Sequence, residues 1–181
     1  MYTFKNILGF EKNNLEHSVC IILINPLCTP VHLALSVKGR YYELNVKGVK
    51  INHSVLEKIQ TSNRRLIPLL FIELEEACCK EIRMPADLIF NSFVTAGKEA
   101  TCLQPIVNFL AENMSADFCE CKVIFDVLEK LMQKKILLKT YHLHLESYLQ
   151  KKSFSLPTYS HKEVEQYILK LKNEKQSNPH A

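Results

Sequence analysis

Cys102 is the residue of this sequence whose type and surroundings point most directly to chemistry. Thr101 and Gln104 have the spacing of a capping box ahead of an apolar stretch, which predicts a helix with Thr101 as its N-cap. Cys102 would then be the first helical residue, where free backbone N–H groups and the positive end of the helix dipole stabilise a thiolate. The alternative is a small buried apolar residue, which is the commoner role of a cysteine.

His32 is the best-placed base for such a thiolate, because it begins a predicted hairpin. Residues 32–37 (HLALSV) and 40–46 (RYYELNV) read as strands joined by a Lys-Gly turn. Folding the hairpin brings the far ends of both strands together, so Glu43 or Asn45 could hold one imidazole nitrogen, depending on side-chain alternation. A nucleophilic cysteine needs an imidazole that a third polar group orients. Otherwise His32 is an ordinary hydrogen-bonded strand residue.

The segments that carry these residues resemble a known family. Residues 30–59 (PVHLALSVKGRYYELNVKGVKINHSVLEKI) are similar to the His-bearing hairpin of the permuted papain-like hydrolases of the NlpC/P60 superfamily. The YiiX-like and lecithin:retinol acyltransferase-like branches are closest. Residues 98–113 (KEATCLQPIVNFLAEN) are similar to the helix that carries the nucleophilic cysteine, and residues 18–26 (SVCIILINP) take the place of the opening strand.

The resemblance implies that Cys102 is the nucleophile, His32 the general base and Glu43 the residue that orients the imidazole. It implies a hydrolase or acyltransferase that attacks an amide, ester or thioester, with N–H groups at the helix start stabilising the oxyanion. Two features depart from the family. Ser18–Val19 replaces the usual Gly-Asp before the opening strand, and the Asn-Cys pair of many members is missing. Residues after 114 have no counterpart in the family.

The order of elements, strands first and helices later, predicts an α+β fold. We expect a small antiparallel sheet from the N-terminal half packed against the Cys102 helix, with a helical C-terminal extension. The corresponding divisions are a core at 1–114, the extension at 115–172 and a disordered polar tail at 173–181. The predicted strands are 19–24, 32–37, 40–46, 49–52 and a stretch within 66–74 that Pro68 places at an edge or breaks. Helices are predicted to begin at Ser54, Thr101, Ser115 and Ser160, and a second helical stretch follows the Ser115 helix to about Lys151 after a break near 134–138.

The composition indicates a folded chain without a membrane span. Of 181 residues, 47% are hydrophobic and 23% are charged. The longest apolar run, 19–24, is far shorter than the ~18–20 residues that cross a bilayer, and residues 1–10 lack the features of a signal peptide. Seven cysteines, an odd number, predict reduced thiols and a cytoplasmic location.

Partners and cofactors are less clearly indicated. Lysines supply every positive charge of residues 118–181, so a basic surface could bind an acidic protein, while the absence of arginine there disfavours nucleic acid. No glycine-rich phosphate loop or zinc spacing is present, and we predict no cofactor and no metal. Cys78–Cys79, beside acidic residues, is predicted to be structural. The alternatives to an enzyme are a protein-interaction module and, less favoured, a winged-helix-like nucleic-acid binder using residues 122–139.

Overall fold

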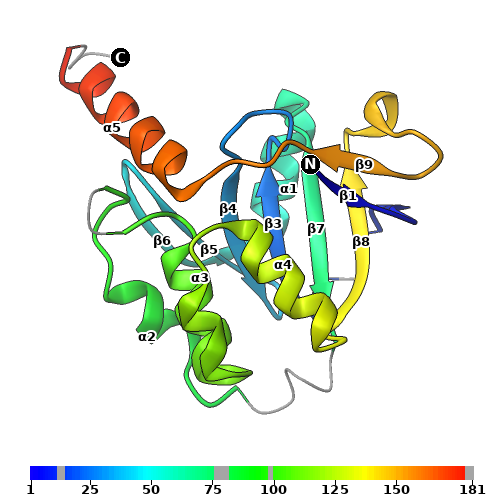
Figure 1. The fold of residues 1–181 in the computed structure, drawn as a ribbon, viewed down its shortest axis with the longest axis horizontal. Coiled ribbons are helices and arrows are strands. Elements are labelled where there is room, and N and C mark those ends of the chain that lie inside the picture. The colour runs from blue at the N-terminus through cyan, green and yellow to red at the C-terminus, as the bar shows by residue number, and fades with distance from the viewer. Residues whose placement is uncertain (12–14, 76–81, 98–99, 178–181) are drawn as a thin grey trace.

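A seven-stranded sheet forms the centre of the molecule (Figure 1). The computed structural model describes residues 1–11, 15–75, 82–97 and 100–177. The strand order is β2-β8-β7-β3-β4-β5-β6, and every neighbouring pair is antiparallel except β2 and β8. A separate antiparallel pair joins β1 to β9. The strands are β1 (Tyr2–Phe4), β2 (Leu8–Gly9), β3 (Val19–Ile24), β4 (His32–Val37), β5 (Arg40–Asn45), β6 (Gly48–Ser54), β7 (Leu69–Leu74), β8 (Leu137–Leu143) and β9 (Phe154–Leu156).

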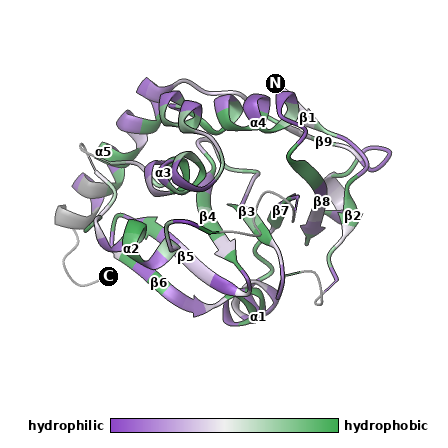
Figure 2. Ribbon diagram, turned by 90° about the horizontal axis from the view of Figure 1, so that it is seen from below, coloured by the Kyte–Doolittle hydropathy of each residue, from purple (hydrophilic) through white to green (hydrophobic). Residues whose placement is uncertain are grey.

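Helices cover both faces of this sheet (Figure 2). The α-helix α1 packs on one face, and α3 and α4 pack on the other. The predicted α+β class is therefore confirmed. Within the described ranges, no helix is both long and apolar enough to cross a bilayer. The helices are α1 (Val55–Arg65), α2 (Ala86–Asn91), α3 (Gln104–Asn113), α4 (Ile124–Gln133) and α5 (His161–Ser177), with short 3₁₀ turns η3 (Ala116–Glu120) and η4 (Glu146–Tyr148).

Side-chain alternation along β3 divides the interior into two cores. All six residues of this strand are buried, as expected of a strand with helices on both sides. Successive side chains of a strand point to opposite faces, so alternate residues enter different cores. The larger core takes Val19, Ile21 and Leu23, whereas the smaller core, under α1, takes Cys20, Ile22 and Ile24.

The β4–β5 hairpin that carries His32 forms as predicted. Leu35 pairs with Tyr42 and Val37 with Arg40. Lys38 and Gly39 both have positive φ, at 48° and 79°, which is the backbone geometry of a tight two-residue hairpin turn. At the other end of β4, His32 pairs with the last residue of β3. The hairpin therefore holds His32 at the end of the sheet where β3 stops.

The predicted caps of two other helices are also present. Ser54 is the N-cap of α1, and its Oγ accepts a hydrogen bond from the Leu56 N–H at 3.3 Å. At the start of α5, Ser160 and Glu163 hydrogen-bond reciprocally: Ser160 Oγ accepts from the Glu163 N–H, and the Glu163 carboxylate accepts from the Ser160 N–H. These caps are local interactions, which explains why spacing alone predicts them.

The C-terminal region is less helical than predicted, and the sheet is larger. Residues 137–143 form β8, which hydrogen-bonds to β7, so the prediction of a second helical stretch to about residue 151 was wrong. The chain leaves α4 through Lys135, whose φ of 58° ends the helix. The ladder with β7 then satisfies the backbone groups of 137–143, an interaction between residues distant in sequence that local periodicity does not reveal.

Two further expectations also differ from the structure. β7 is an interior strand between β3 and β8, not an edge strand, because Pro68 lies before its first residue and removes no N–H from the ladder. The last helix reaches Ser177, so the part of the expected disordered tail before residue 178 is helical. Cys78–Cys79, predicted to be structural, lies outside the described residues.

Candidate functional site

Three side chains from distant parts of the chain meet at the end of β4. His32 Nε2 lies 2.9 Å from Oε1 of Glu43, which projects from β5. Cys102 comes from the turn before α3, lines the same cavity as His32 and is one of the groups that raise the pKa of His32. Because Nε2 faces the carboxylate, Nδ1 is the ring nitrogen left for the thiol. The structure thus brings together Cys102, His32 and Glu43, the residues singled out from the sequence.

Cys102 does not occupy the helical position that its sequence context predicts. The first residue of α3 is Gln104 and its N-cap is Leu103, so Cys102 lies in the turn that precedes the helix. Thr101 still organises this turn, since its Oγ1 accepts from the Leu103 N–H at 3.3 Å and its carbonyl accepts from the Gln104 N–H at 3.1 Å. The capping-box spacing identified a helix start, but the helix begins two residues later than predicted. The thiol is partly exposed beside this start.

Four donors hold the Glu43 carboxylate in place. Besides the His32 ring, the Tyr41 hydroxyl donates to Oε2 at 2.7 Å, Lys50 Nζ donates to Oε2 at 2.9 Å and Asn45 Nδ2 donates to Oε1 at 3.0 Å. Only 8% of the Glu43 side chain is exposed. Burial alone would raise its pKa, but the hydrogen bonds from His32, Lys50 and Tyr41 hold the pKa of Glu43 well below its usual range. The carboxylate is therefore ionised and fixed.

This network shows which of the two candidate residues contacts the imidazole. Glu43 contacts His32, and Asn45 instead donates to Glu43. Tyr41 and Lys50 were not singled out from the sequence. The Tyr-x-Glu-x-Asn alternation of the strand was a signal for Tyr41, because residues two apart share a face. Lys50 is opposite Glu43 in the β5–β6 register, which depends on the turn between these strands.

The surroundings of His32 favour its protonated form. Burial lowers the pKa of His32, but hydrogen bonds to Cys102 and Glu43 outweigh it and raise the pKa from 6.5 to about 9. An imidazolium at neutral pH has both nitrogens as donors, one toward the carboxylate and one toward the sulfur. Such an arrangement can take the proton of a thiol and return it to a leaving group.

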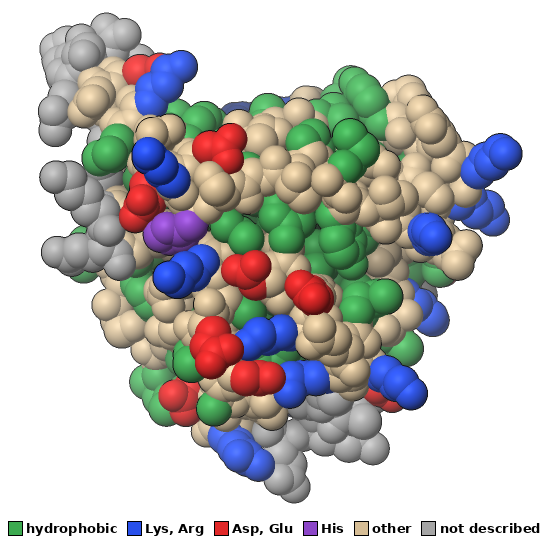
Figure 3. Space-filling model, viewed as in Figure 1, with side chains coloured by type: hydrophobic (Ala, Val, Ile, Leu, Met, Phe, Trp, Pro, Cys, Tyr) green, Lys and Arg blue, Asp and Glu red, His purple; other side chains and the backbone are tan. Residues whose placement is uncertain are grey.

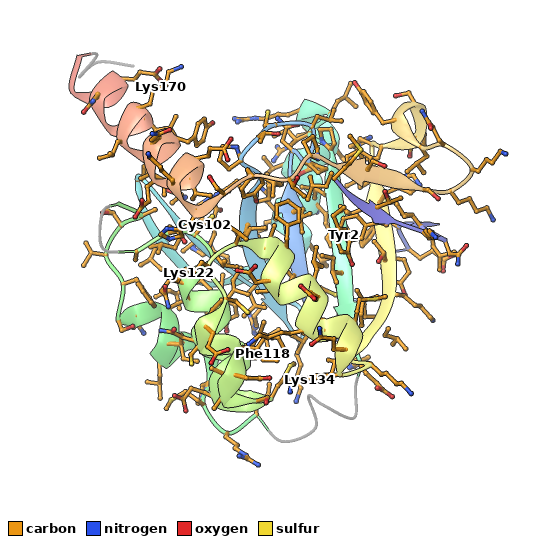
Figure 4. The ribbon with its side chains drawn as sticks, viewed as in Figure 1. Tyr2, Cys102, Phe118, Lys122, Lys134 and Lys170 are labelled. Carbon is orange, nitrogen blue, oxygen red and sulfur yellow. The ribbon has the colours of Figure 1, made fainter. Side chains whose placement is uncertain are left out.

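A cavity of about 410 Å³ opens over the three residues. Figure 4 shows Cys102 between the upper end of α3 and the start of α5. The polar lining comes mainly from the β3 and β5 ends, and much of the rest is apolar. The lining residues are Ile24, Asn25, Cys28, Pro30, Val31, His32, Glu43, Leu44, Asn45, Val46, Lys47, Ala96, Cys102, Val164, Tyr167, Ile168 and Leu171.

Tyr159 is a buried neighbour of Cys102 that the sequence gave no reason to select. Burial, followed by the charge of Cys102, raises the pKa of this phenol, and its hydroxyl hydrogen-bonds with the backbone of Val31. Tyr159 therefore keeps its proton and links the segment before α5 to the residue next to His32. Its position depends on how the chain returns from β9, more than fifty residues after Cys102, which no local pattern encodes.

Cys28 is a second thiol of the cavity, and it differs from Cys102 in its partner. The Asn25 side-chain amide donates to the Cys28 sulfur at 3.0 Å. Cys28 is exposed, and each cysteine in the described ranges is free of disulfide bonds. Among the cysteines of the described ranges, Cys102 is the one that raises the pKa of His32.

A scan against protein-family models found no match, and searches of curated proteins and of solved structures found none either. The functional argument for this chain therefore depends on the geometry of the site.

Proposed function

We propose that the protein is a cysteine-dependent hydrolase or acyltransferase that cleaves an amide, ester or thioester bond. The observation that carries the proposal is the position of His32 between the Cys102 thiol and the ionised Glu43 carboxylate. This is the nucleophile, base and orienting group that covalent acyl transfer requires. The resemblance of residues 18–113 to the permuted papain-like hydrolases agrees with the same assignment.

The proposed reaction has two steps. The Cys102 sulfur attacks the acyl carbon while its proton resides on His32. The Leu103 and Gln104 N–H groups at the start of α3 already donate to Thr101, so they are not assigned to the oxyanion. His32 then protonates the leaving amine, alcohol or thiol, and a thioester of Cys102 remains. Water or another acceptor then gives a proton to His32 and attacks the thioester carbon. The carbon–sulfur bond breaks, the acid or the acylated acceptor is released, and Cys102 and His32 return to their starting state. Glu43 stays ionised throughout, fixes the ring and stabilises its positive charge.

The proposed chemistry has consequences for the substrate, the cofactor and the location of the protein. The substrate bears an acyl group, no cofactor takes part in the steps above, and the free thiols suit a cytoplasmic location.

The alternative, an interaction module with a basic C-terminal surface, has less support. Lys130 pairs with Glu120 and Lys134 pairs with Asp117, which neutralises part of that charge. Figure 3 likewise shows acidic and basic side chains interspersed on this face.

The pH dependence of Cys102 alkylation by iodoacetamide tests the proposal. We expect a fast rate with a plateau well below pH 8, because an imidazolium partner stabilises the thiolate. His32→Ala should restore the ordinary titration of a free thiol, with a midpoint near ~8.5. Mass spectrometry with fragment ions distinguishes Cys102 from the exposed Cys119, which serves as an internal reference.

The matched control is His17→Ala. His17 is exposed and precedes the opposite end of β3, so its removal should leave the Cys102 profile unchanged. Slow labelling of Cys102 with an ordinary thiol titration, indifferent to His32, would contradict the catalytic assignment.

A further inference from the structure

The C-terminal helix α5 supplies one wall of the cavity that contains Cys102. Val164, Ile168 and Leu171 line it together with Tyr167. The first three are spaced by four and three residues, so they form one stripe along the helix. Ile168 is 6% exposed, while Val164 and Leu171 are half-buried. The neighbouring Leu169 does not line the cavity and is 38% exposed.

Other elements also contribute apolar side chains to the cavity. Val31, Leu44 and Val46 line it together with the α5 stripe, and His32 and Cys102 are among its polar lining residues. A substrate with its acyl carbon at Cys102 would therefore place a polar group near His32 and an apolar group along α5. Burial of apolar surface against such a wall is favourable and roughly proportional to the area removed from water.

We infer that α5 is the specificity-determining wall of the site and selects an extended apolar acyl group on the substrate. The inference rests on the proposed function and adds the class of acyl group and the residues that choose it. A cavity of about 150 Å³ holds one benzene, so the 410 Å³ found here accommodates roughly 16 non-hydrogen atoms. The reciprocal cap of Ser160 and Glu163 fixes where the helix begins and hence where the stripe lies.

The position of α5 agrees with a role other than packing in the core between the sheet and the helices. Figure 1 shows its later turns extending beyond the sheet, so the helix contributes little to the packing between sheet and helices. Around the apolar stripe its surface carries charged side chains such as Lys162, Glu165 and Lys170, which are exposed. Changes along the stripe are therefore expected to alter the cavity without unfolding the domain.

The test is the rate of Cys102 labelling by a series of N-alkyl iodoacetamides, from methyl to decyl, on the full chain. For the native sequence we expect the second-order rate constant to rise with chain length, by about fourfold per methylene until the cavity is filled. Leu171→Lys should flatten this dependence. Leu169→Lys, the same change on the same helix outside the cavity, should preserve it.

A second variant keeps the test independent of the charge introduced at residue 171. Ile168→Ala enlarges the cavity, so the preferred alkyl chain should become longer. Labelling of the exposed Cys119 in the same samples reports any effect of the alkyl chain that is unrelated to the cavity. Circular dichroism melting curves establish that each variant is folded.

The outcomes separate this inference from the proposed function. If Cys102 reacts rapidly at low pH in a His32-dependent way but its rate is independent of chain length, or if both lysine variants behave alike, the role of α5 is overturned and the catalytic proposal stands. If unsubstituted iodoacetamide already shows an ordinary thiol titration at Cys102, the proposed function itself fails.

Discussion

Two thiols of this chain lie beside basic side chains, yet their surroundings are opposite in kind. Cys102 is partly exposed in a cavity and interacts with His32, which Glu43 orients. Cys121 is 6% exposed, and burial raises its pKa to about 11 although Lys130 is nearby. Lys130 already donates to Glu120 and to the backbone carbonyl of Asp117.

Cys121 shows that a nearby positive charge is not enough to lower the pKa of a thiol. At Cys121, desolvation of the thiolate and three neighbouring carboxylates outweigh the lysine. At Cys102, the neighbouring carboxylate acts on the histidine and not on the thiol. Glu43 contacts the His32 ring and is one of the groups that raise its pKa. A lysine with a high pKa also cannot cycle a proton at neutral pH as an imidazole can.

The largest expected effect is a loss of activity on replacement of Cys102, with little effect on replacement of Cys121. Cys102→Ser should reduce the cleavage of activated acyl esters by about a thousandfold or more, since the covalent step is lost. Cys121→Ser should leave the rate within about twofold, because Cys121 lies outside the cavity. Release of p-nitrophenol from p-nitrophenyl esters measures both. Equal rates in the native protein and Cys102→Ser would rule out the assigned nucleophile.

A smaller effect is expected from Glu43→Gln, which removes the negative charge next to the imidazole. The pKa of His32 should fall from about 9 toward 6.5, because the carboxylate is one of the groups that raise it. Cleavage should fall by about a hundredfold at neutral pH. The His32 titration is followed by NMR of its ring protons.

The matched control for this change is Glu120→Gln in the other region. Glu120 is one of the carboxylates that raise the pKa of Cys121, so its neutralisation should lower that pKa slightly and leave His32 unaffected. A His32 titration that is the same with and without the Glu43 charge would show that the ring is not coupled to it.

The smallest expected effect is on stability as a function of pH. The pKa of His32 is raised on folding, so its contribution to stability is complete below about 6.5 and is lost as the pH rises through about 9. The contribution of Glu43, whose pKa is lowered, is present above about 4.5 and is lost as the pH falls. The free energy of unfolding, measured with urea at pH 5.5 and at pH 8.5, should decrease more between these pH values for the native protein than for His32→Gln.

The contribution of Cys121 to stability is lost in a different pH range from that of His32, so the two contributions can be measured separately. Its pKa is raised from 9.0 to about 11, so the neutral thiol contributes until the pH exceeds about 9. Cys121→Ser should therefore change the pH dependence of unfolding only above that value. If the free energy of unfolding changed equally with pH in His32→Gln and in the native protein between pH 5.5 and 8.5, the coupling of His32 to its neighbours would be contradicted.

Local patterns accounted for much of the scaffold of the site. A two-residue turn between alternating strands predicts the hairpin that carries His32 and Glu43, and the Thr101–Gln104 spacing predicts a helix start at Cys102 to within two residues. These features depend on interactions between residues close in sequence, such as caps and turns. The α+β class also follows from the order of the elements.

The chain after residue 133 shows where local patterns were insufficient. Residues 137–143 were expected to be helical but form β8, because pairing with β7 decides their conformation. Lys50 reaches Glu43 through the β5–β6 register, and Tyr159 reaches the neighbourhood of Cys102 through the path of the chain after β9. Each of these contacts joins residues from different elements.

The sequence by itself determined the chemical groups of this protein and the local elements that carry them: a cysteine near a helix start and a histidine and glutamate on one hairpin. Only the tertiary structure decided that Cys102 lies beside His32, that four donors hold Glu43 and that α5 lines the cavity. The physical reason is the range of the interactions. Caps, turns and strand alternation act over a few residues, whereas the burial and charge coupling of the site arise only when distant segments exclude water together.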